Sequence, residues 1–150
     1  MRLTEMRPSH LMLVSLRASE KDMEEVAALG LDMEFWAMSR AQAKGLNFTI
    51  LDENEMPVAC FGLLDDGPPG VVTAWGVRDP RAPALGLKLG KRVFREMLRT
   101  GGYRRVQAQA RELNAPAVRL IEWLGFKYEG RKDNYFLDGS AMLEYVICAQ

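Results

Sequence analysis

The sequence has few of the side chains from which metal sites and covalent catalysts are built. Among its 150 residues there is one histidine, His10, and there are two cysteines, Cys60 and Cys148, which lie too far apart for a paired metal-ligand motif. A nucleophilic cysteine needs a neighbouring base, and the single histidine lies in the N-terminal segment. We therefore expect no metal and no cysteine catalysis, with both thiols buried in a protein of the reducing cytoplasm.

Excess charge of either sign is also lacking. The 20 basic residues balance 20 acidic ones, which leaves a net charge of zero at neutral pH. Because no overall field attracts polyanions, neither nucleic acid nor a membrane surface is an expected partner. Basic residues do gather between positions 88 and 105, where a solvated helix face is the favoured interpretation over a polyanion site.

Long hydrophobic runs and internal repeats are absent as well. No run reaches the ~18 apolar residues of a membrane span, and residues 1–10 carry charges without the apolar core of a signal peptide. With 48% apolar and 27% charged residues, the composition is that of an ordinary globular protein. We expect one soluble domain over residues 1–150, in which residues 1–10 form a flexible segment.

The most informative stretch covers residues 71–126, whose pattern predicts a strand, a loop, a helix, a second strand and a second helix. Residues 71–77 are mostly β-branched or aromatic, and two prolines follow them, so the chain leaves the sheet there. Apolar residues at helical spacing then run from Leu85 to a pair of glycines, and Asn114 is suited to cap the second helix, which Gly125 ends. The first helix begins at the carboxyl end of a strand, where unpaired amides and a partial positive charge suit an anion.

Shorter segments on both sides complete the pattern. The expected elements are a strand at 11–17, helices at 19–30 and 32–45, strands at 48–51 and 58–64 joined by a hairpin turn, strands at 127–131 and 141–147, and a short strand at 135–137. The order predicts an α/β three-layer fold. Its sheet is mixed and mostly antiparallel, with six or seven strands, about four flanking helices, and a meander formed by the first four strands.

Two stretches resemble motifs of a known family. Residues 85–90 read Leu-Gly-Leu-Lys-Leu-Gly, and residues 114–126 contain Asn114, Ala117 and Leu120 before a final Gly-Phe pair. This resembles the GCN5-related N-acetyltransferase (GNAT) superfamily, whose phosphate loop reads Gln/Arg-x-x-Gly-x-Gly/Ala and whose later helix reads Asn-x-x-Ala-x-x-Leu-Tyr-x-x-x-Gly-Phe. The second motif is matched well, whereas the first is matched poorly.

The departures from the family pattern fall on positions that bind ligand or supply a proton. Leu85 stands where Gln or Arg is expected, and Lys88 stands where the first glycine is expected. Ile121 occupies the position at which the family commonly has a tyrosine that protonates the leaving thiolate. A narrower resemblance is to the small acetyltransferase-like proteins of short-tailed phages, some of them internal virion proteins, which have a similarly altered loop.

The resemblance implies a GNAT-like fold, acetyl-CoA as cofactor and direct attack by an amine. The phosphates of acetyl-CoA would suit the basic residues noted above. By the same resemblance, the residues expected to bind the cofactor are Trp75, Gly76, Val77, Leu87, Lys88, Leu89, Gly90, Lys91 and Asn114.

Candidates for the acid and the base are less well defined. Tyr128 and Tyr135 are the tyrosines that could replace the acid missing at position 121, although a role in packing is favoured for both. Strand 71–77 carries no carboxylate, so a base would have to come from Glu34, Glu53 or Glu55 through water.

Two functional hypotheses remain open at this point. One is an N-acetyltransferase that acts on a small-molecule or protein amine. The other is a non-catalytic module of the same fold that contacts virion proteins, other proteins or a second copy of itself, for which an exposed Trp36 or Trp123 would provide a surface. Asn114 is either a pantetheine contact or an N-cap, and Met33, Phe35, Trp36 and Met38 are core residues or pocket walls, with core favoured.

Overall fold

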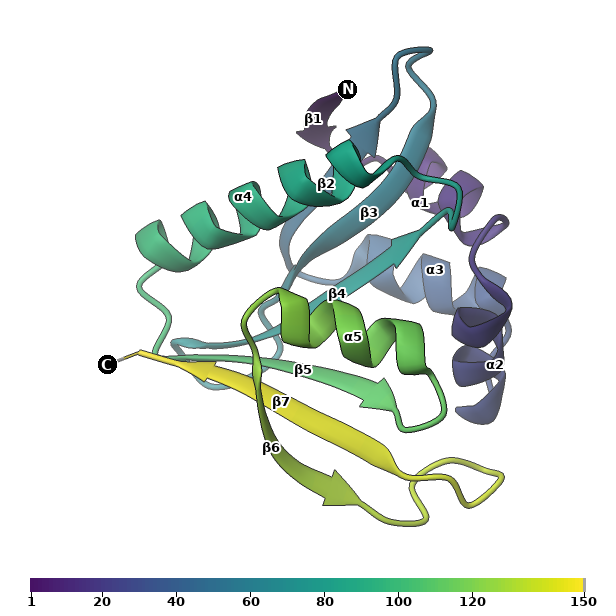
Figure 1. The fold of residues 1–150 in the computed structure, drawn as a ribbon, viewed down its shortest axis with the longest axis vertical. Helices are drawn as coiled ribbons and strands as arrows, with labels where there is room; N and C mark the ends of the chain where they lie inside the picture. The colour runs from purple at the N-terminus through teal and green to yellow at the C-terminus, as the bar shows by residue number, and fades with distance from the viewer. Residues whose placement is uncertain (150) are drawn as a thin grey trace.

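The computed structural model describes residues 1–149, in which a seven-stranded sheet lies between two layers of helices (Figure 1). The strands follow the order β1-β2-β3-β4-β5-β7-β6 across the sheet. This confirms the predicted α/β fold with a mixed sheet, and the described residues form five helices. Along the chain the elements are β1 (Arg2–Glu5), α1 (Pro8–Ser15), α2 (Glu20–Ala28), α3 (Met33–Gln42), β2 (Gly45–Leu51), β3 (Pro57–Leu64), β4 (Val71–Arg78), α4 (Ala84–Thr100), β5 (Arg105–Arg111), α5 (Ala115–Trp123), β6 (Lys127–Lys132) and β7 (Met142–Cys148).

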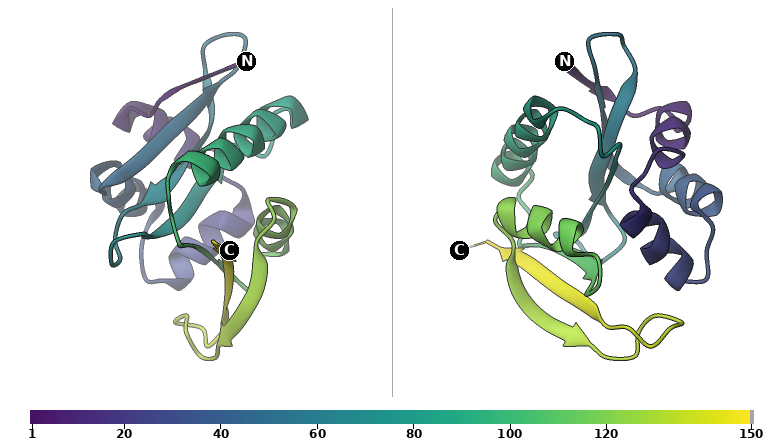
Figure 2. Two further views of the ribbon diagram at one scale, coloured as in Figure 1. Left: turned by 90° about the vertical axis from the view of Figure 1, so that its left-hand side faces the viewer. Right: turned by 45° about the vertical axis from the view of Figure 1, so that its right-hand side comes forward.

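The helices divide between the two faces of the sheet (Figure 2). Helices α1, α2 and α3 lie on one face, and α4 and α5 lie on the other. Side chains alternate along a strand, so β3 and β4 serve two cores: Cys60 and Val77 pack towards α1 and α3, while Leu63 and Val72 pack towards α4 and α5. Within residues 1–149, no helix is both long and apolar enough to cross a membrane.

The sheet opens at its centre. Strands β1 to β4 form an antiparallel meander, and β5, β7 and β6 form an antiparallel group. The two groups are joined by the parallel pair β4 and β5, which are in register only from Val71 with Arg105 to Thr73 with Gln107. Beyond Thr73 the two strands diverge, as Figure 1 shows. This divergence positions the candidate site.

The N-terminal segment differs from the sequence prediction. The strand predicted at 11–17 is wrong, because these residues belong largely to α1, which begins at Pro8. The first strand of the meander is instead β1, which pairs with β2 and lies in the segment that the sequence suggests is flexible. Periodicity alone cannot separate a short buried helix from a strand, and Leu11 and Val14, three positions apart, are both fully buried on one helical face.

The short strand predicted at 135–137 is also wrong. Asn134 has a positive φ of 53°, so the chain turns there instead of extending. Phe136 is buried, and the amide of Leu137 donates to the carbonyl of Ala28 at the end of α2, at 2.9 Å. The amides of Tyr135 and Phe136 donate to the carbonyl of Ser140 within the same segment, so the segment is a loop that packs on α2 and not a strand.

Ser19 and Asp32, the first residues of the helices predicted at 19–30 and 32–45, are N-caps of α2 and α3. The side chain of Ser19 accepts from the amide of Asp22 at 3.2 Å, and Asp32 accepts from Phe35 at 2.7 Å. Gly125, which follows α5, has a φ of 102°, a value that residues other than glycine rarely adopt. Local signals therefore set the ends of these helices.

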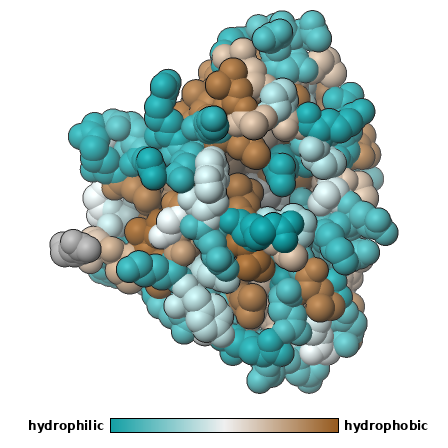
Figure 3. All heavy atoms as spheres, in the orientation of Figure 1, coloured by the Kyte–Doolittle hydropathy of each residue, from teal (hydrophilic) through white to brown (hydrophobic). Residues whose placement is uncertain are grey.

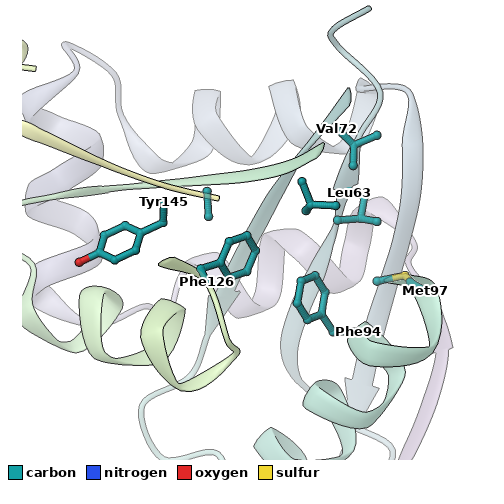
Figure 4. Packing of buried hydrophobic residues seen from close by; sticks show 8 residues of the cluster. Leu63, Val72, Phe94, Met97, Phe126 and Tyr145 are labelled. Carbon is teal, nitrogen blue, oxygen red and sulfur yellow. The ribbon is translucent and has the colours of Figure 1, made fainter. Parts of the chain in front are cut away.

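The larger core joins α4 and α5 to the sheet (Figure 4). Phe94 of α4 and Phe126, which follows α5, stack with their ring centroids 5.5 Å apart. Leu63, Val72 and Tyr145 supply the strand side of this core. Because both helices are fixed to the sheet by this core, the space between them and the diverging strands is held open.

Candidate functional site

The main hollow of the molecule lies where β4 and β5 separate. Strand β4 pairs with β3 as far as Arg78, but its pairing with β5 ends at Thr73. On that edge, none of the described strands pairs with residues 74–78, so their main-chain groups face a gap. A cleft of about 480 Å³ fills this gap and continues between α4 and α5. We call it the β4–β5 cleft; its walls include residues 74–78, Leu87, Gly90, Lys91 and Phe94 of α4, and Ala117, Arg119, Leu120, Ile121 and Trp123 of α5.

The β4–β5 cleft has an apolar interior and a cationic border. Apolar surface is visible in the middle of this face between α4 and α5, with hydrophilic side chains around it (Figure 3). Arg78, Lys91 and Arg119 line the cleft, and the Lys91 ammonium lies 4.1 Å from the centroid of the Trp123 ring. Such a cleft suits a ligand that combines anionic groups with apolar or aromatic parts.

The two glycines of α4 allow this helix to lie close to the sheet. A Cβ on Gly86 would lie 3.2 Å from Met1 Cε, and a Cβ on Gly90 would lie 3.4 Å from Ile50 Cδ1. Both glycines therefore face the neighbouring strands, and their small size serves packing. The amide of Gly86 already donates to the carbonyl of Pro83 at 2.9 Å, so among the first amides of α4 those of residues 84 and 85 are the ones left for an anion.

A second hollow lies on the opposite face of the sheet. This α2–α3 pocket has a volume of about 140 Å³ and lies between α2, α3 and strands β4 and β5. Its walls include Asp22, Glu25, Val26 and Leu29 of α2, Met33, Trp36 and Arg40 of α3, residues 73–77, residues 109–111, Phe136 and Met142. The β4–β5 cleft and the α2–α3 pocket share residues 74–77, Asp22, Glu25 and Gln109, so they meet at the gap between the two strands.

Glu25 is the carboxylate that the structure brings to this meeting point. Its Oε1 accepts from the amide of Arg111 at 2.5 Å and from Asn114 Nδ2 at 3.4 Å. Its Oε2 forms no hydrogen bond with any described residue. Burial raises the pKa of Glu25 above its ordinary value, and the bonds from Arg111 and Asn114 only partly oppose this. A carboxylate with a raised pKa in a hollow is suited to proton transfer.

Asn114 joins α5 to the acidic residues of α2. Its side-chain oxygen accepts from the amide of Ala117 at 3.4 Å, which confirms the N-cap. Its Nδ2 donates to Asp22 at 2.9 Å as well as to Glu25, and the residue is almost completely buried. Asn114 is not among the residues that line the β4–β5 cleft, so a contact with pantetheine stays a prediction.

The structure brings together six of the nine residues predicted to bind the cofactor. Trp75, Gly76, Val77, Leu87, Gly90 and Lys91 line the β4–β5 cleft. Lys88 and Leu89, like Asn114, lie outside its walls, and Lys88 is exposed to solvent.

The predicted acids and bases lie elsewhere. Tyr128 and Tyr135 are both exposed, and neither lines the cleft or the pocket; Tyr128 packs edge-on against Tyr145, with the ring centroids 5.7 Å apart. The three predicted bases, Glu34, Glu53 and Glu55, are also exposed and lie outside both hollows.

The expectation that the large apolar side chains of α3 are core is confirmed for Met33 and Trp36, which pack against the core on that face of the sheet, and is wrong for Phe35 and Met38. Met33 and Trp36 line the α2–α3 pocket, and Trp36 packs edge-on against Trp75 with centroids 5.9 Å apart. Phe35 and Met38 point outward, with 57% and 50% of their surface exposed. One face of α3 lines the pocket and the opposite face is exposed to solvent, so its apolar residues divide between the two faces.

Sequence reasoning misses Glu25 and Asp22. A signal is present, because the two acids are three residues apart and therefore share a helical face with the apolar residues Val26 and Leu29. Acids on the apolar side of an amphipathic helix are unusual, since charged groups are seldom buried without a reason. The contact of that face with the end of β5 cannot be read from spacing.

The two thiols have different environments. Cys60 is buried, and burial raises its pKa to about 11, although Thr49 hydrogen-bonds it at 3.5 Å and His10 in turn contacts Thr49 at 3.0 Å. Cys60 therefore stays protonated at neutral pH. Cys148 is exposed, so the prediction that both thiols are buried is wrong for this residue, which lies at the end of β7.

The difference between the thiols predicts selective alkylation. Iodoacetamide should modify Cys148 in the native protein and leave Cys60 intact, because the reagent needs an accessible thiolate. In denaturant both residues should react. Peptide mass spectrometry before and after denaturation checks this, and fast native labelling of Cys60 would contradict it.

Comparison with known proteins identifies the fold. The sequence matches no protein-family model and no curated protein. Its structure is similar to an acetyltransferase of the GNAT family from Bacillus anthracis, with a TM-score of 0.71, 15% identity and coverage of 97% of this chain and 93% of that chain. It is similar to spermidine N-acetyltransferase from Vibrio cholerae in complex with CoA and spermine, with a TM-score of 0.72, 13% identity and coverage of 98% and 94%. It is also similar to ribosomal-protein-S5-alanine acetyltransferase from Vibrio fischeri, with a TM-score of 0.69, 12% identity and coverage of 97% and 91%.

The chain therefore has the GNAT fold, as the sequence resemblance implies. At these levels of identity the likeness concerns the fold alone. The three similar structures are bacterial acetyltransferases and give no support to the narrower resemblance to phage proteins.

Proposed function

We propose that the protein transfers the acetyl group of acetyl-CoA, bound in the β4–β5 cleft, to an amine bound in the α2–α3 pocket. One observation carries the proposal: the two hollows open on opposite faces of the sheet and meet at residues 74–77, where one edge of β4 is unpaired. Two ligands that enter from opposite faces would meet there. The GNAT fold of the chain is consistent with this reaction.

The residues of the cleft fit the parts of acetyl-CoA. When bound, acetyl-CoA supplies an acetyl thioester and a pyrophosphate. Arg78, Lys91 and Arg119 provide cations for phosphate groups, and the Trp123 ring provides an aromatic face. The unpaired edge of β4 offers main-chain groups to the amides of the pantetheine arm, in the way that a sheet edge binds an extended peptide.

In the reaction, the amine nitrogen bonds to the acetyl carbon, and the bond between that carbon and sulfur breaks. Main-chain amides of residues 74–78 are placed to stabilise the negative charge on the carbonyl oxygen. Glu25 takes the proton that the amine loses, since a raised pKa lies closer to neutral pH and makes the carboxylate a better proton acceptor. Protonation of the departing thiolate falls to water, because Ile121 in the cleft wall has no hydroxyl group.

A second candidate is the non-catalytic module, in a virion or in another assembly. It is favoured by the replacement of the family's tyrosine by Ile121 and by the exposure of Leu85 and Lys88 at positions of the family's phosphate loop. In this case the cleft would have no cofactor.

Calorimetric titration with acetyl-CoA and with CoA tests the proposal. Wild-type protein should bind both, and Arg119→Glu should weaken binding about tenfold or more, because it reverses a charge at the border of the cleft. Lys127→Glu is the control, since Lys127 is an exposed cation of β6 that lies outside both hollows and outside the basic stretch at 88–105. A folded wild-type protein that binds neither ligand at millimolar concentration would overturn the proposal in favour of the non-catalytic module.

A further inference from the structure

Arg40 is an arginine in the wall of the α2–α3 pocket whose charge has no partner. It lies in the last turn of α3, and its guanidinium carbon is 5.4 Å from the centroid of the Trp36 ring. Its Nε is buried and makes no hydrogen bond within residues 1–149, and no carboxylate of this part of the chain forms an ion pair with it. Arg111, the other arginine of the pocket, is bound by Ser140 and Asp138.

Arg40 is partly buried, and a cation without an ion-pair partner at such a position favours an anion from outside. Burial lowers the pKa of Arg40, although an arginine stays charged at any ordinary pH. Asp66 attracts Arg40 from a distance, but its Oδ1 accepts from the hydroxyl of Thr73 at 3.2 Å. A carboxylate in the pocket would supply the missing acceptors in the bidentate geometry that guanidinium groups prefer.

The opposite end of the pocket carries negative charge. Asp22 and Glu25 lie beside Arg111 at the end of β5, where α2 is seen in Figure 1. Arg40 lies towards Thr73, because Asp66, the acid that attracts Arg40, accepts a hydrogen bond from Thr73. Thr73 is paired with Gln107, which precedes Arg111 by four residues on β5, or ~13 Å along the strand. Between the two ends lie Met33, Trp36 and Trp75. The pocket is therefore acidic at one end, apolar in the middle and cationic at the other.

We infer that the α2–α3 pocket takes a small molecule with both an amine and a carboxylate, that is, an amino acid in the broad sense. The amine lies at Asp22 and Glu25, and the carboxylate lies on Arg40. A volume of about 140 Å³ limits the occupant to the size of one small molecule. A polyamine fits less well, because Arg40 repels a second ammonium group. This inference names the acceptor of the proposed reaction, but binding to the pocket is measurable without acetyl-CoA.

The test is a calorimetric titration with a series of ω-amino acids, from glycine to 6-aminohexanoate, and with n-alkylamines of matching chain length. At least one amino acid should bind about tenfold or more tightly than its matched amine, and spermine should bind more weakly than that amino acid. The series also reports the distance between the two charged ends. Trp36 and Trp75 border the pocket, so a change in tryptophan fluorescence gives a second readout.

Two variants assign the preference to Arg40. Arg40→Leu should remove the preference for the amino acid over the amine, and Arg40→Lys, which keeps the charge without the planar fork, should retain part of it. Circular dichroism establishes that both variants are folded. Equal binding of amino acid and amine by the wild type, tighter binding of spermine, or no binding of any amino acid at millimolar concentration would each overturn the inference.

The outcome is separable from that of the proposed function. Binding of acetyl-CoA without binding of any amino acid would leave the proposed reaction in place with a different acceptor. Binding of an amino acid without binding of acetyl-CoA would support the α2–α3 pocket as an amino-acid site and contradict the proposed acetyl transfer.

Discussion

Replacing Glu25 by glutamine is expected to lower the rate of amine acetylation about 10²- to 10⁴-fold, the usual contribution of a general base. The side chain keeps its shape, and its amide oxygen still accepts from the amide of Arg111. It can no longer take a proton from the amine. Acetyl-CoA should bind as in the wild type, since the carboxylate is placed to act on the amine. Thiol release from acetyl-CoA, measured with the best acceptor of the amino acid series, gives the rate.

The pH dependence identifies the role of Glu25. In the wild type the rate should rise with pH through a pKa above 4.5, the ordinary value for glutamate, because burial favours the protonated carboxyl. In Glu25→Gln this rise should be missing, and the deficit should shrink at high pH, where the amine loses its proton to solvent. Glu20→Gln is the control, because Glu20 is an exposed acid of the same helix outside both hollows. If Glu25→Gln acetylates the amine as fast as the control variant, Glu25 is not the general base.

The same substitution has a predicted effect on stability. Because the pKa of Glu25 is raised in the folded protein, this group stabilises the fold at low pH, and that contribution is lost as pH rises from about 4.5 through the folded pKa. Glutamine has no such titration. Glu25→Gln should therefore gain stability relative to the wild type as pH rises through this window. Urea unfolding at several pH values measures the difference in the free energy of unfolding. The same measurement shows whether Glu25→Gln is folded, so that a lower acetylation rate can be assigned to the missing carboxylate.

Replacing Asn114 by alanine is expected to destabilise the protein by about 2–4 kcal/mol, since an N-cap contributes about 1 kcal/mol and a hydrogen bond to a charged group about 1.5–3 kcal/mol. Asn114 makes both kinds of contact: its oxygen caps α5, and its amide binds Asp22 and Glu25. Without it, the two partly buried carboxylates of α2 lose a shared donor. Chemical unfolding at neutral pH gives the free energy of unfolding.

Asn114→Ser separates the two contacts. Serine caps a helix as well as asparagine does, but it is too short to replace the link to α2, so this variant should recover about 1 kcal/mol of the loss. Both variants should shift the pH dependence of the rate to higher pH, because Asn114 lowers the pKa of Glu25. Unchanged stability in Asn114→Ala would contradict the structural role. If acetyl-CoA binding weakens in both variants while their folds persist, Asn114 also contacts pantetheine, as the sequence resemblance implies.

The succession from β4 to α5 could be predicted because its signals are local. The β-branched run of β4, the two prolines after it, the glycines after α4 and the N-cap Asn114 each act within a few residues of their position in the chain. The resemblance to the GNAT superfamily then implies Trp75, Gly76, Val77, Gly90 and Lys91 as cofactor contacts, and the fold brings these residues to the wall of the cleft.

The N-terminal elements illustrate where local signals fail. Residues 11–15 are apolar enough for a strand or for a buried helix, and packing against α3 and β3 decides in favour of the helix. β1 has only four residues, and only its pairing with β2 makes it a strand. The segment itself decides neither outcome, since each depends on a surface formed by other elements that lie well apart from it in the sequence.

By itself the sequence therefore determined the order of elements from β2 to β6 and the N-cap of α5. Tertiary structure alone decided the chemistry of the site. Spacing places Glu25 on the apolar side of α2, but Glu25 and Arg40 gain their properties only because the divergence of β4 and β5 leaves a pocket between them. A charge changes its pKa, or becomes available to a ligand, through the groups that surround it, and these groups come from α2, α3, β4 and β5 only after the chain has folded.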